Sequence, residues 1–157
     1  MEACCFTGHR RLPGGEEGAR LRARVEAAVR EAYAAGCRRF YAGGALGFDM
    51  LAAAVVCLLR DTEYSDMSLW LLLPCRGQEA HWSPRDRARY AEMLALSDSY
   101  VYLAEEYREG VMAARNRALV EAADLCIAYM TNPASGTGGT VAMARRRGIP
   151  VRNLAEQ

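Results

Sequence analysis

Residues Arg39–Leu59 have the sequence RFYA-GGALGFD-MLAAAVVCLL, and the fold class can be predicted from this segment. Its first four residues have the length of a short strand and are apolar after Arg39, and Gly43 and Gly44 end this strand. The segment from Phe48 to Leu59 is nearly all apolar and too long for a strand, so it is predicted to be a buried helix. A strand that leads through a glycine loop into a buried helix is typical of α/β folds with a parallel sheet.

The same alternation continues along the whole chain. Further strands are predicted at 3–7, 68–73, 99–103, 125–129 and 150–154, and further helices at 16–35, 84–96, 111–122 and 140–147. The expected fold class is therefore α/β: a three-layer, Rossmann-like, doubly wound and mostly parallel sheet of about six strands with helices on both faces. Because no linker or repeat interrupts the pattern, residues 1–157 are expected to form one domain.

Composition limits the classes of function. The 20 basic residues are all arginine and balance 19 acidic ones, so the net charge of +1 gives no sign of a dedicated duplex-binding protein. No run reaches the roughly 20 apolar residues that span a bilayer, and the N-terminus lacks the basic segment of a signal peptide. The six cysteines form no Cys-x-x-Cys pair and are expected to be reduced and mostly buried, as in a cytoplasmic protein.

The candidate site lies in the loops after the strands, because ligands of open parallel sheets bind beyond the carboxyl ends of the strands. The first two loops contribute the candidate residues Thr7, Gly8, His9, Arg10, Gly43, Gly44, Ala45, Gly47 and Asp49. Arginine suits phosphate recognition, and the amides of the helix that follows the second loop suit an anion. Asp49 would cap that helix or bind a ribose hydroxyl. A surface turn and a tight packing turn are the alternative interpretations.

The strongest local pattern precedes the last helix. Its small and hydroxyl-bearing residues expose backbone amides beside a helix N-terminus, and the candidate ligand residues are Ser135, Gly138, Gly139 and Thr140. The alternative interpretation of this glycine-rich segment is a flexible loop. The pair Arg115-Asn116 on the preceding helix adds polar groups, and its alternative interpretation is a pair that faces solvent. Cys75 follows a strand and is either a reactive thiol beside Arg76 or an inert buried one. No metal site or catalytic residue is assigned.

Several of these motifs together resemble one family. Cys5-Phe6-Thr7-Gly8-His9-Arg10, Gly43–Asp49, Pro74-Cys75 with Gln78 and Trp82, Arg115-Asn116, and Gly138-Gly139-Thr140 occur in the order typical of the YpsA family of the SLOG superfamily, which includes Smf/DprA and LOG proteins. The resemblance covers about Ala3 to Leu154. It implies a Rossmann-like domain that binds a nucleotide or a nucleotide-derived ligand. It also implies a pocket built from the loops after the first, second and fifth strands, with Arg115-Asn116.

The chain departs from these relatives at two positions. Ala54 stands where the helix after the first glycine loop often carries a glutamate, and Met143 stands where LOG enzymes carry the glutamate of their glycine motif. Cleavage of a glycosidic bond needs carboxylates for acid–base work. Glu121 and Asp49 are the substitutes that the sequence offers.

Three functions follow from these observations. The first is a nucleotide-binding sensor or regulator without strong catalysis, whose ligand is a nucleotide or an ADP-ribose-like molecule. The second is a LOG-like N-glycosidic hydrolase of nucleoside monophosphates. The third is a DprA-like binder of single-stranded DNA, although near-zero net charge does not favour nucleic acid as a partner. The resemblance also implies a bacterial homo-oligomer, and no membrane partner is expected.

Overall fold

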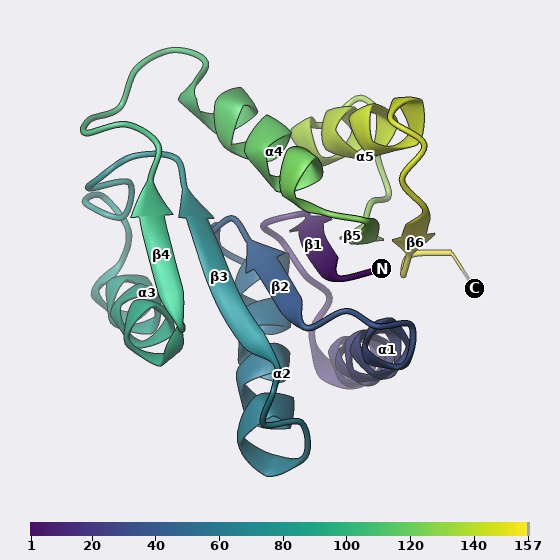
Figure 1. Cartoon of the computed structure of the whole chain (residues 1–157). Helices are drawn as coiled ribbons and strands as arrows, with labels where there is room; N and C mark the ends of the chain where they lie inside the picture. Colours follow the sequence, from purple (N-terminus) through teal and green to yellow (C-terminus); the bar gives the residue numbers. More distant parts are fainter. Residues whose placement is uncertain (157) are drawn as a thin grey trace.

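The structure, a computed structural model, describes residues 1–156 and contains a six-stranded parallel sheet in the order β4-β3-β2-β1-β5-β6 (Figure 1). The strands are β1 (Ala3–Gly8), β2 (Arg39–Ala42), β3 (Ser68–Leu73), β4 (Ser99–Tyr102), β5 (Leu125–Tyr129) and β6 (Val151–Asn153). The helices are α1 (Gly15–Ala34), α2 (Phe48–Thr62), α3 (Pro84–Leu96), α4 (Val111–Ala122) and α5 (Gly136–Arg146). Strict alternation and parallel pairing of every neighbouring strand confirm the expected α/β, Rossmann-like fold class.

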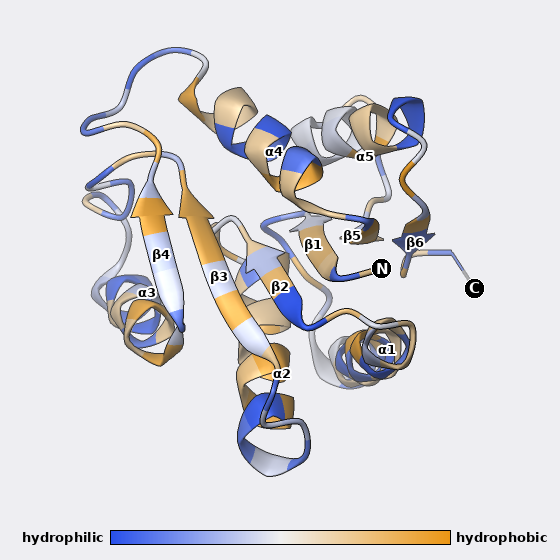
Figure 2. Cartoon of the chain, in the orientation of Figure 1, coloured by the Kyte–Doolittle hydropathy of each residue, from blue (hydrophilic) through white to orange (hydrophobic). Residues whose placement is uncertain are grey.

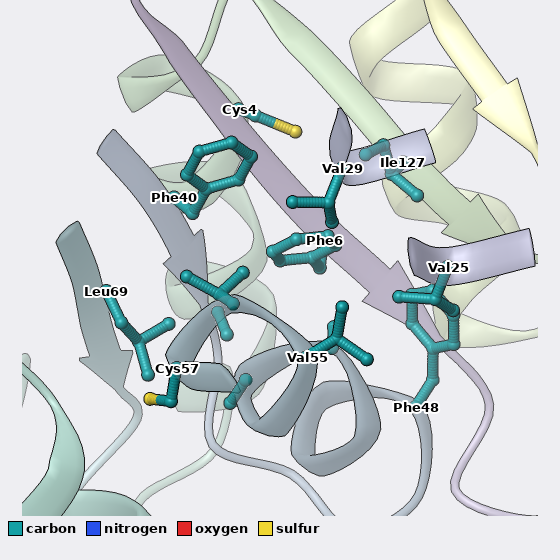
Figure 3. Packing of buried hydrophobic residues seen from close by; sticks show 14 of the residues in the cluster. Cys4, Phe6, Val25, Val29, Phe40, Phe48, Val55, Cys57, Leu69 and Ile127 are labelled. Carbon is teal, nitrogen blue, oxygen red and sulfur yellow. The ribbon is translucent and has the colours of Figure 1, made fainter. Parts of the chain in front are cut away.

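Helices cover both faces of the sheet, as a doubly wound fold requires. On one face, α4 packs over β1, β2 and β3, and α5 packs over β1, β5 and β6; α1, α2 and α3 lie on the other face (Figure 1). The main core lies between the sheet and α1–α2, where the ring of Phe6 packs 6.1 Å from that of Phe40 and 6.4 Å from that of Phe48 (Figure 3). Figure 2 shows most of β3 and much of α2 in the orange of hydrophobic residues. The apolar 48–59 run is therefore a buried helix, as predicted.

Two serine caps set the starts of helices. The Ser83 hydroxyl accepts a hydrogen bond from the amide of Asp86 at 3.1 Å, so α3 begins at Pro84 as the sequence predicts. The Ser135 hydroxyl accepts one from the amide of Gly138 at 3.0 Å, so α5 begins at Gly136. The prediction of a loop up to Gly138 and a helix from 140 was therefore wrong by about one turn. Glycine is a poor helix former, but the cap outweighs that preference here.

Other helix and strand ends shift by a few residues. The helix predicted to end at Leu59 continues to Thr62, where Arg60 donates hydrogen bonds to the carbonyl of Leu96 at 2.9 Å and to Asp98 at 2.8 Å. The polar last turn carries no apolar periodicity, so the sequence pattern did not include it.

The strand predicted at 99–103 ends at Tyr102 because its partner β3 ends at Leu73, just before Pro74. Proline has no amide hydrogen to continue a ladder. β1 extends to Gly8, and β6 is confined to Val151–Asn153.

All six cysteines are free and buried, as expected of reduced structural thiols. Within residues 1–156, no helix has both the length and the apolar character needed to cross a membrane.

The sheet order places the expected ligand site. The chain adds β2, β3 and β4 on one side of β1 and then returns to add β5 and β6 on the other. The connection after β1 leads to α1 on one face, and the connection after β5 leads to α5 on the opposite face (Figure 1). A crevice at such a switch point is where open α/β sheets bind ligands.

Candidate functional site

A pocket of about 270 Å³ opens at the switch point between β1 and β5. Its walls come from the end of β1, the β2–α2 loop, α4 and the N-terminus of α5. The residues predicted from the sequence that line this pocket are Thr7, Gly8, His9, Arg10, Ala45, Asp49, Arg115, Asn116 and Ser135. The fold therefore brings together four segments that are far apart in the sequence.

The remaining predicted residues lie outside the lining of this pocket: Gly43, Gly44, Gly47, Gly138, Gly139 and Thr140. Gly138 packs so closely on the Pro133 carbonyl that a side chain would collide with it. Gly139 is exposed, with no atom near the position of an added Cβ. The Thr140 hydroxyl donates back to the Gly136 carbonyl at 3.1 Å, so it serves the helix itself.

The N-terminus of α5 forms one wall of the pocket through Ser135, Gly136 and Thr137. Sequence reasoning missed Gly136 and Thr137, although the capping serine three residues before Gly138 is a signal that could have located them. The first amides of a helix have no acceptor within the helix. Together with the helix dipole, such amides attract an anion. The wall is therefore suited to a phosphate or a carboxylate.

Asp49 fixes the β2–α2 loop from within. Its Oδ2 accepts a hydrogen bond from the Ala45 amide at 3.1 Å, and the residue is only 5% exposed. Burial raises the pKa of the Asp49 carboxyl, whereas the charge of Arg115 and the amides of Ala45 and Gly43 oppose that rise. This carboxyl is thus bound to the loop backbone, which places the Ala45 amide inside the loop rather than toward the pocket.

Arg115 links α4 to the same loop. Its side chain is buried; Nη1 donates to the Gly43 carbonyl at 2.6 Å, and Nε donates to Asn116 Oδ1 at 2.7 Å. Burial lowers the pKa of the Arg115 guanidinium, and the nearby Asp49 carboxylate raises it. A Cβ at Gly43 would lie 2.8 Å from Arg115 Cδ, so glycine makes room for the arginine. The predicted Arg-Asn pair therefore faces the pocket instead of solvent.

The residues after β1 form the rim. His9 Nε2 accepts a hydrogen bond from the Thr131 amide at 2.8 Å, and its ring packs edge-on against Tyr129 at 5.8 Å. This arrangement ties the β1 end to the β5 end. Arg10 is exposed, and within residues 1–156 it forms no ion pair. Its guanidinium is available to a ligand at the mouth of the pocket.

Chemistry that needs several carboxylates has few candidates here. Among the described residues, Asp49 is the one acidic residue that lines the pocket, and Glu121 is exposed on α4 outside it. No group of His, Cys, Asp or Glu in residues 1–156 is arranged to hold a metal ion. Cys75 is buried, and burial raises the pKa of its thiol, so the reactive thiolate is disfavoured. The structure thus supports the inert interpretation of Cys75.

Comparisons with known proteins find a family match and a related sequence. The model of the YpsA family, described as the YspA SLOG family, matches residues 16–146. The UPF0398 protein of Shouchella clausii (strain KSM-K16) is 33% identical over 106 residues, which are 66% of this chain and 56% of that protein. The chain thus spans little more than half the length of that relative.

Two solved structures share the fold. DNA processing protein A from Helicobacter pylori, described in terms of its single-stranded DNA binding mode, has a TM-score of 0.65 and 19% identity, over 96% of this chain and 63% of that one. DNA processing protein A from Streptococcus pneumoniae has a TM-score of 0.66 and 15% identity, over 96% of this chain and 49% of that one. The family match covers β2 to β5 and, apart from Gly15, all five helices, so the chain belongs to the YpsA family of SLOG proteins.

Proposed function

We propose that this protein binds a nucleotide or a nucleotide-derived ligand, such as an ADP-ribose-like molecule, and that it acts as a sensor or regulator without strong catalysis. The observation that carries the proposal is the pocket wall formed by the capped N-terminus of α5, which Arg10 and Arg115 face from the other elements. A phosphate at Gly136 and Thr137 would meet helix amides and two guanidinium groups.

The same pocket suits a nucleoside. The apolar side chains of Phe6, Met112 and Leu119 line it beside the polar Asn116. Ligand pockets typically combine an apolar lining with a few placed polar groups. A base or ribose lying on these residues would leave its phosphate directed toward α5.

A LOG-like hydrolase is the second candidate, because Asp49 lines the pocket. That role requires a carboxyl free to exchange protons with a substrate, whereas Asp49 already accepts a hydrogen bond from the Ala45 amide. Release of free base from a nucleoside monophosphate, measured by chromatography, separates the two functions. A binder without catalysis leaves the nucleotide intact, and hydrolysis that stops in an Asp49→Asn variant would support the enzyme.

The experiment that tests the proposal is a thermal-shift screen with nucleoside mono-, di- and triphosphates, ADP-ribose and NAD. A ligand at 100 times its Kd stabilises the fold by about 2.7 kcal/mol, which is roughly 5–11 °C for a domain of this size. Thr137→Glu places a negative charge in the pocket wall and should abolish the shift.

Gly139→Glu is the matched control for that variant. It adds the same charge to the same helix, at an exposed position outside the pocket with open space around it. Its ligand-induced shift should equal that of the wild type. Absence of a shift with every ligand, or equal loss in both variants, would refute a nucleotide site at α5. A shift with single-stranded DNA alone would favour the DprA-like function instead.

We further propose that the protein is cytoplasmic, because the six free thiols stay reduced in that compartment. We also propose that it forms a homo-oligomer. Val101 and Tyr100 on the edge strand β4 are 48% and 47% exposed. Sedimentation at several protein concentrations tests self-association, and a single monomeric species at all of them would contradict it.

A further inference from the structure

A second and larger groove lies beside the nucleotide pocket, on the other side of the β2–α2 loop. Its volume is about 590 Å³, and its walls come from the segment after β1, from α1, from α2 and from the start of α3. Arg10 lines both cavities, so the two meet at this residue. The function proposed above does not use the groove.

The groove has an excess of positive charge. Four arginines line it, Arg10, Arg22, Arg85 and Arg89, against the single acid Asp86. Arg89 lies 4.0 Å from Asp86, and Arg22 pairs at 3.6 Å with Glu26, which lies outside the groove. Within residues 1–156, Arg10 and Arg85 form no ion pair. Guanidinium groups of this kind recognise phosphate oxygens, often with two parallel hydrogen bonds.

The floor of the groove is apolar. It is formed by side chains of the α1 approach, the β2–α2 loop and α2: Leu12, Pro13, Leu46, Met50, Leu51 and Ala54. At Gly47 the β2–α2 loop packs against the Arg10 carbonyl, and this contact leaves no room for a side chain. The φ of Gly47, 82°, also favours glycine. An apolar floor under a rim of arginines suits a flat or aliphatic body that carries phosphates.

We propose that this groove is a second subsite for the distal half of an extended ligand, a dinucleotide whose phosphate chain passes Arg10 while its second nucleoside lies on the apolar floor. The placement of the first nucleotide of this ligand in the α5 pocket rests on the proposed function. The binding of phosphates by the arginines of the groove stands independently of it. The ligand class is therefore larger and more highly charged than a mononucleotide.

Ala54→Glu is the variant that tests the groove. Ala54 is exposed on α2, lines the groove and does not line the α5 pocket. Glutamate is compatible with a helix, and its carboxylate would repel phosphates from the four arginines. The matched control is Ala91→Glu, at an exposed position of α3 that lines neither cavity.

Calorimetric titrations of AMP, diadenosine tetraphosphate and inorganic tripolyphosphate give three separate readouts. Diadenosine tetraphosphate should bind the wild type at least tenfold more tightly than AMP. Ala54→Glu should remove that advantage and leave the AMP affinity unchanged, and Ala91→Glu should change neither affinity. Equal affinities of both nucleotides for the wild type would overturn the proposal that one dinucleotide occupies both cavities. The same conclusion would follow if Ala54→Glu still bound diadenosine tetraphosphate more tightly than AMP by the wild-type factor.

Tripolyphosphate distinguishes failure of the groove from failure of the proposed function. Its binding should weaken at least tenfold in Ala54→Glu and in Arg85→Ala, and persist in Thr137→Glu, in which the α5 pocket is blocked. If tripolyphosphate follows this pattern and AMP does not bind, the groove is an anion site and the α5 pocket is not a nucleotide site. If tripolyphosphate binds Ala54→Glu and the wild type equally, the groove is not an anion site.

Discussion

Replacing Arg115 by methionine should destabilise the fold and make its stability depend on pH in a defined direction. The guanidinium donates to the Gly43 carbonyl at 2.6 Å and to Asn116 Oδ1 at 2.7 Å, and it lies near the buried Asp49 carboxyl. Methionine keeps much of the length of the side chain and removes the charge. The variant therefore leaves a carbonyl without its donor and a buried carboxyl without its nearby cation.

The expected loss follows from removing a buried guanidinium, which leaves the nearby buried Asp49 carboxyl without a compensating charge. Leaving a buried charge uncompensated typically costs about 3–5 kcal/mol, and hydrogen bonds to charged groups contribute about 1.5–3 kcal/mol. For a domain of this size, 3–5 kcal/mol corresponds to roughly 6–20 °C in Tm. Arg117→Met, at an exposed position of the same helix, should cost less than about 0.5 kcal/mol.

Asp49 gives the loss its dependence on pH. Burial already raises the pKa of this carboxyl above 3.8, and Arg115 opposes the rise, so the variant should raise the pKa further. A carboxyl whose folded-state pKa is raised stabilises the fold below its unfolded pKa, and this contribution is lost as the pH rises through the folded-state pKa. The deficit of the variant should therefore be smallest near pH 4 and grow toward pH 8, by up to about 1.4 kcal/mol per pH unit.

Urea unfolding at several pH values between 4.5 and 8, followed by circular dichroism and extrapolated linearly, measures this deficit. The double variant Asp49→Asn/Arg115→Met should lose the pH-dependent part, because asparagine stays neutral and still accepts a hydrogen bond from the Ala45 amide. A deficit below about 1 kcal/mol at pH 8, or one that is the same at both ends of the range, would refute the electrostatic coupling of Asp49 to Arg115.

Three further predictions concern stability and reactivity. Ser135→Ala should cost about 1 kcal/mol in urea unfolding through loss of the cap on the Gly138 amide, and an unchanged midpoint would show that the cap contributes nothing. Gly47→Ala should destabilise more than Gly148→Ala, because both have positive φ but only Gly47 also meets a neighbouring backbone, that of Arg10; equal losses would contradict this. The six buried thiols should react with a thiol reagent fast in denaturant and slowly in buffer, and a fast native phase would show that one is accessible.

Most of the fold could be predicted from hydrophobic periodicity and from the residues that begin or end helices and strands. The apolar 48–59 run, the strand bounds at 39–42 and 68–73, and the Ser83-Pro84 helix start are local signals, and each appears in the structure where it was predicted. The one-turn error at α5 has a local cause as well. Three glycines in Gly136–Gly139 indicated a loop, whereas the Ser135 cap and the packing of Gly138 on Pro133 stabilise a helix there.

The pocket could be predicted in outline, because carboxyl ends of parallel strands meet at one edge. Which face of each loop lies toward the pocket depends on contacts that no local pattern contains. The Ala45 amide binds Asp49, and the side chain of Arg115 crosses to Gly43, a residue 72 positions away. The second groove was missed for the same reason, since its four arginines come from three separate segments and only Arg10 belongs to a recognisable motif.

A ¹⁵N–¹H NMR titration of the protein with the nucleotide that gives the largest thermal shift locates the phosphate residue by residue. The amide signals of Gly136 and Thr137 should move strongly and saturably, because a phosphate in the pocket accepts hydrogen bonds from the start of α5. The Gly139 amide, which already donates to the Ser135 carbonyl at 3.0 Å, should move little. Saturable binding with unmoved Gly136 and Thr137 signals would contradict the assignment of α5 as the phosphate site.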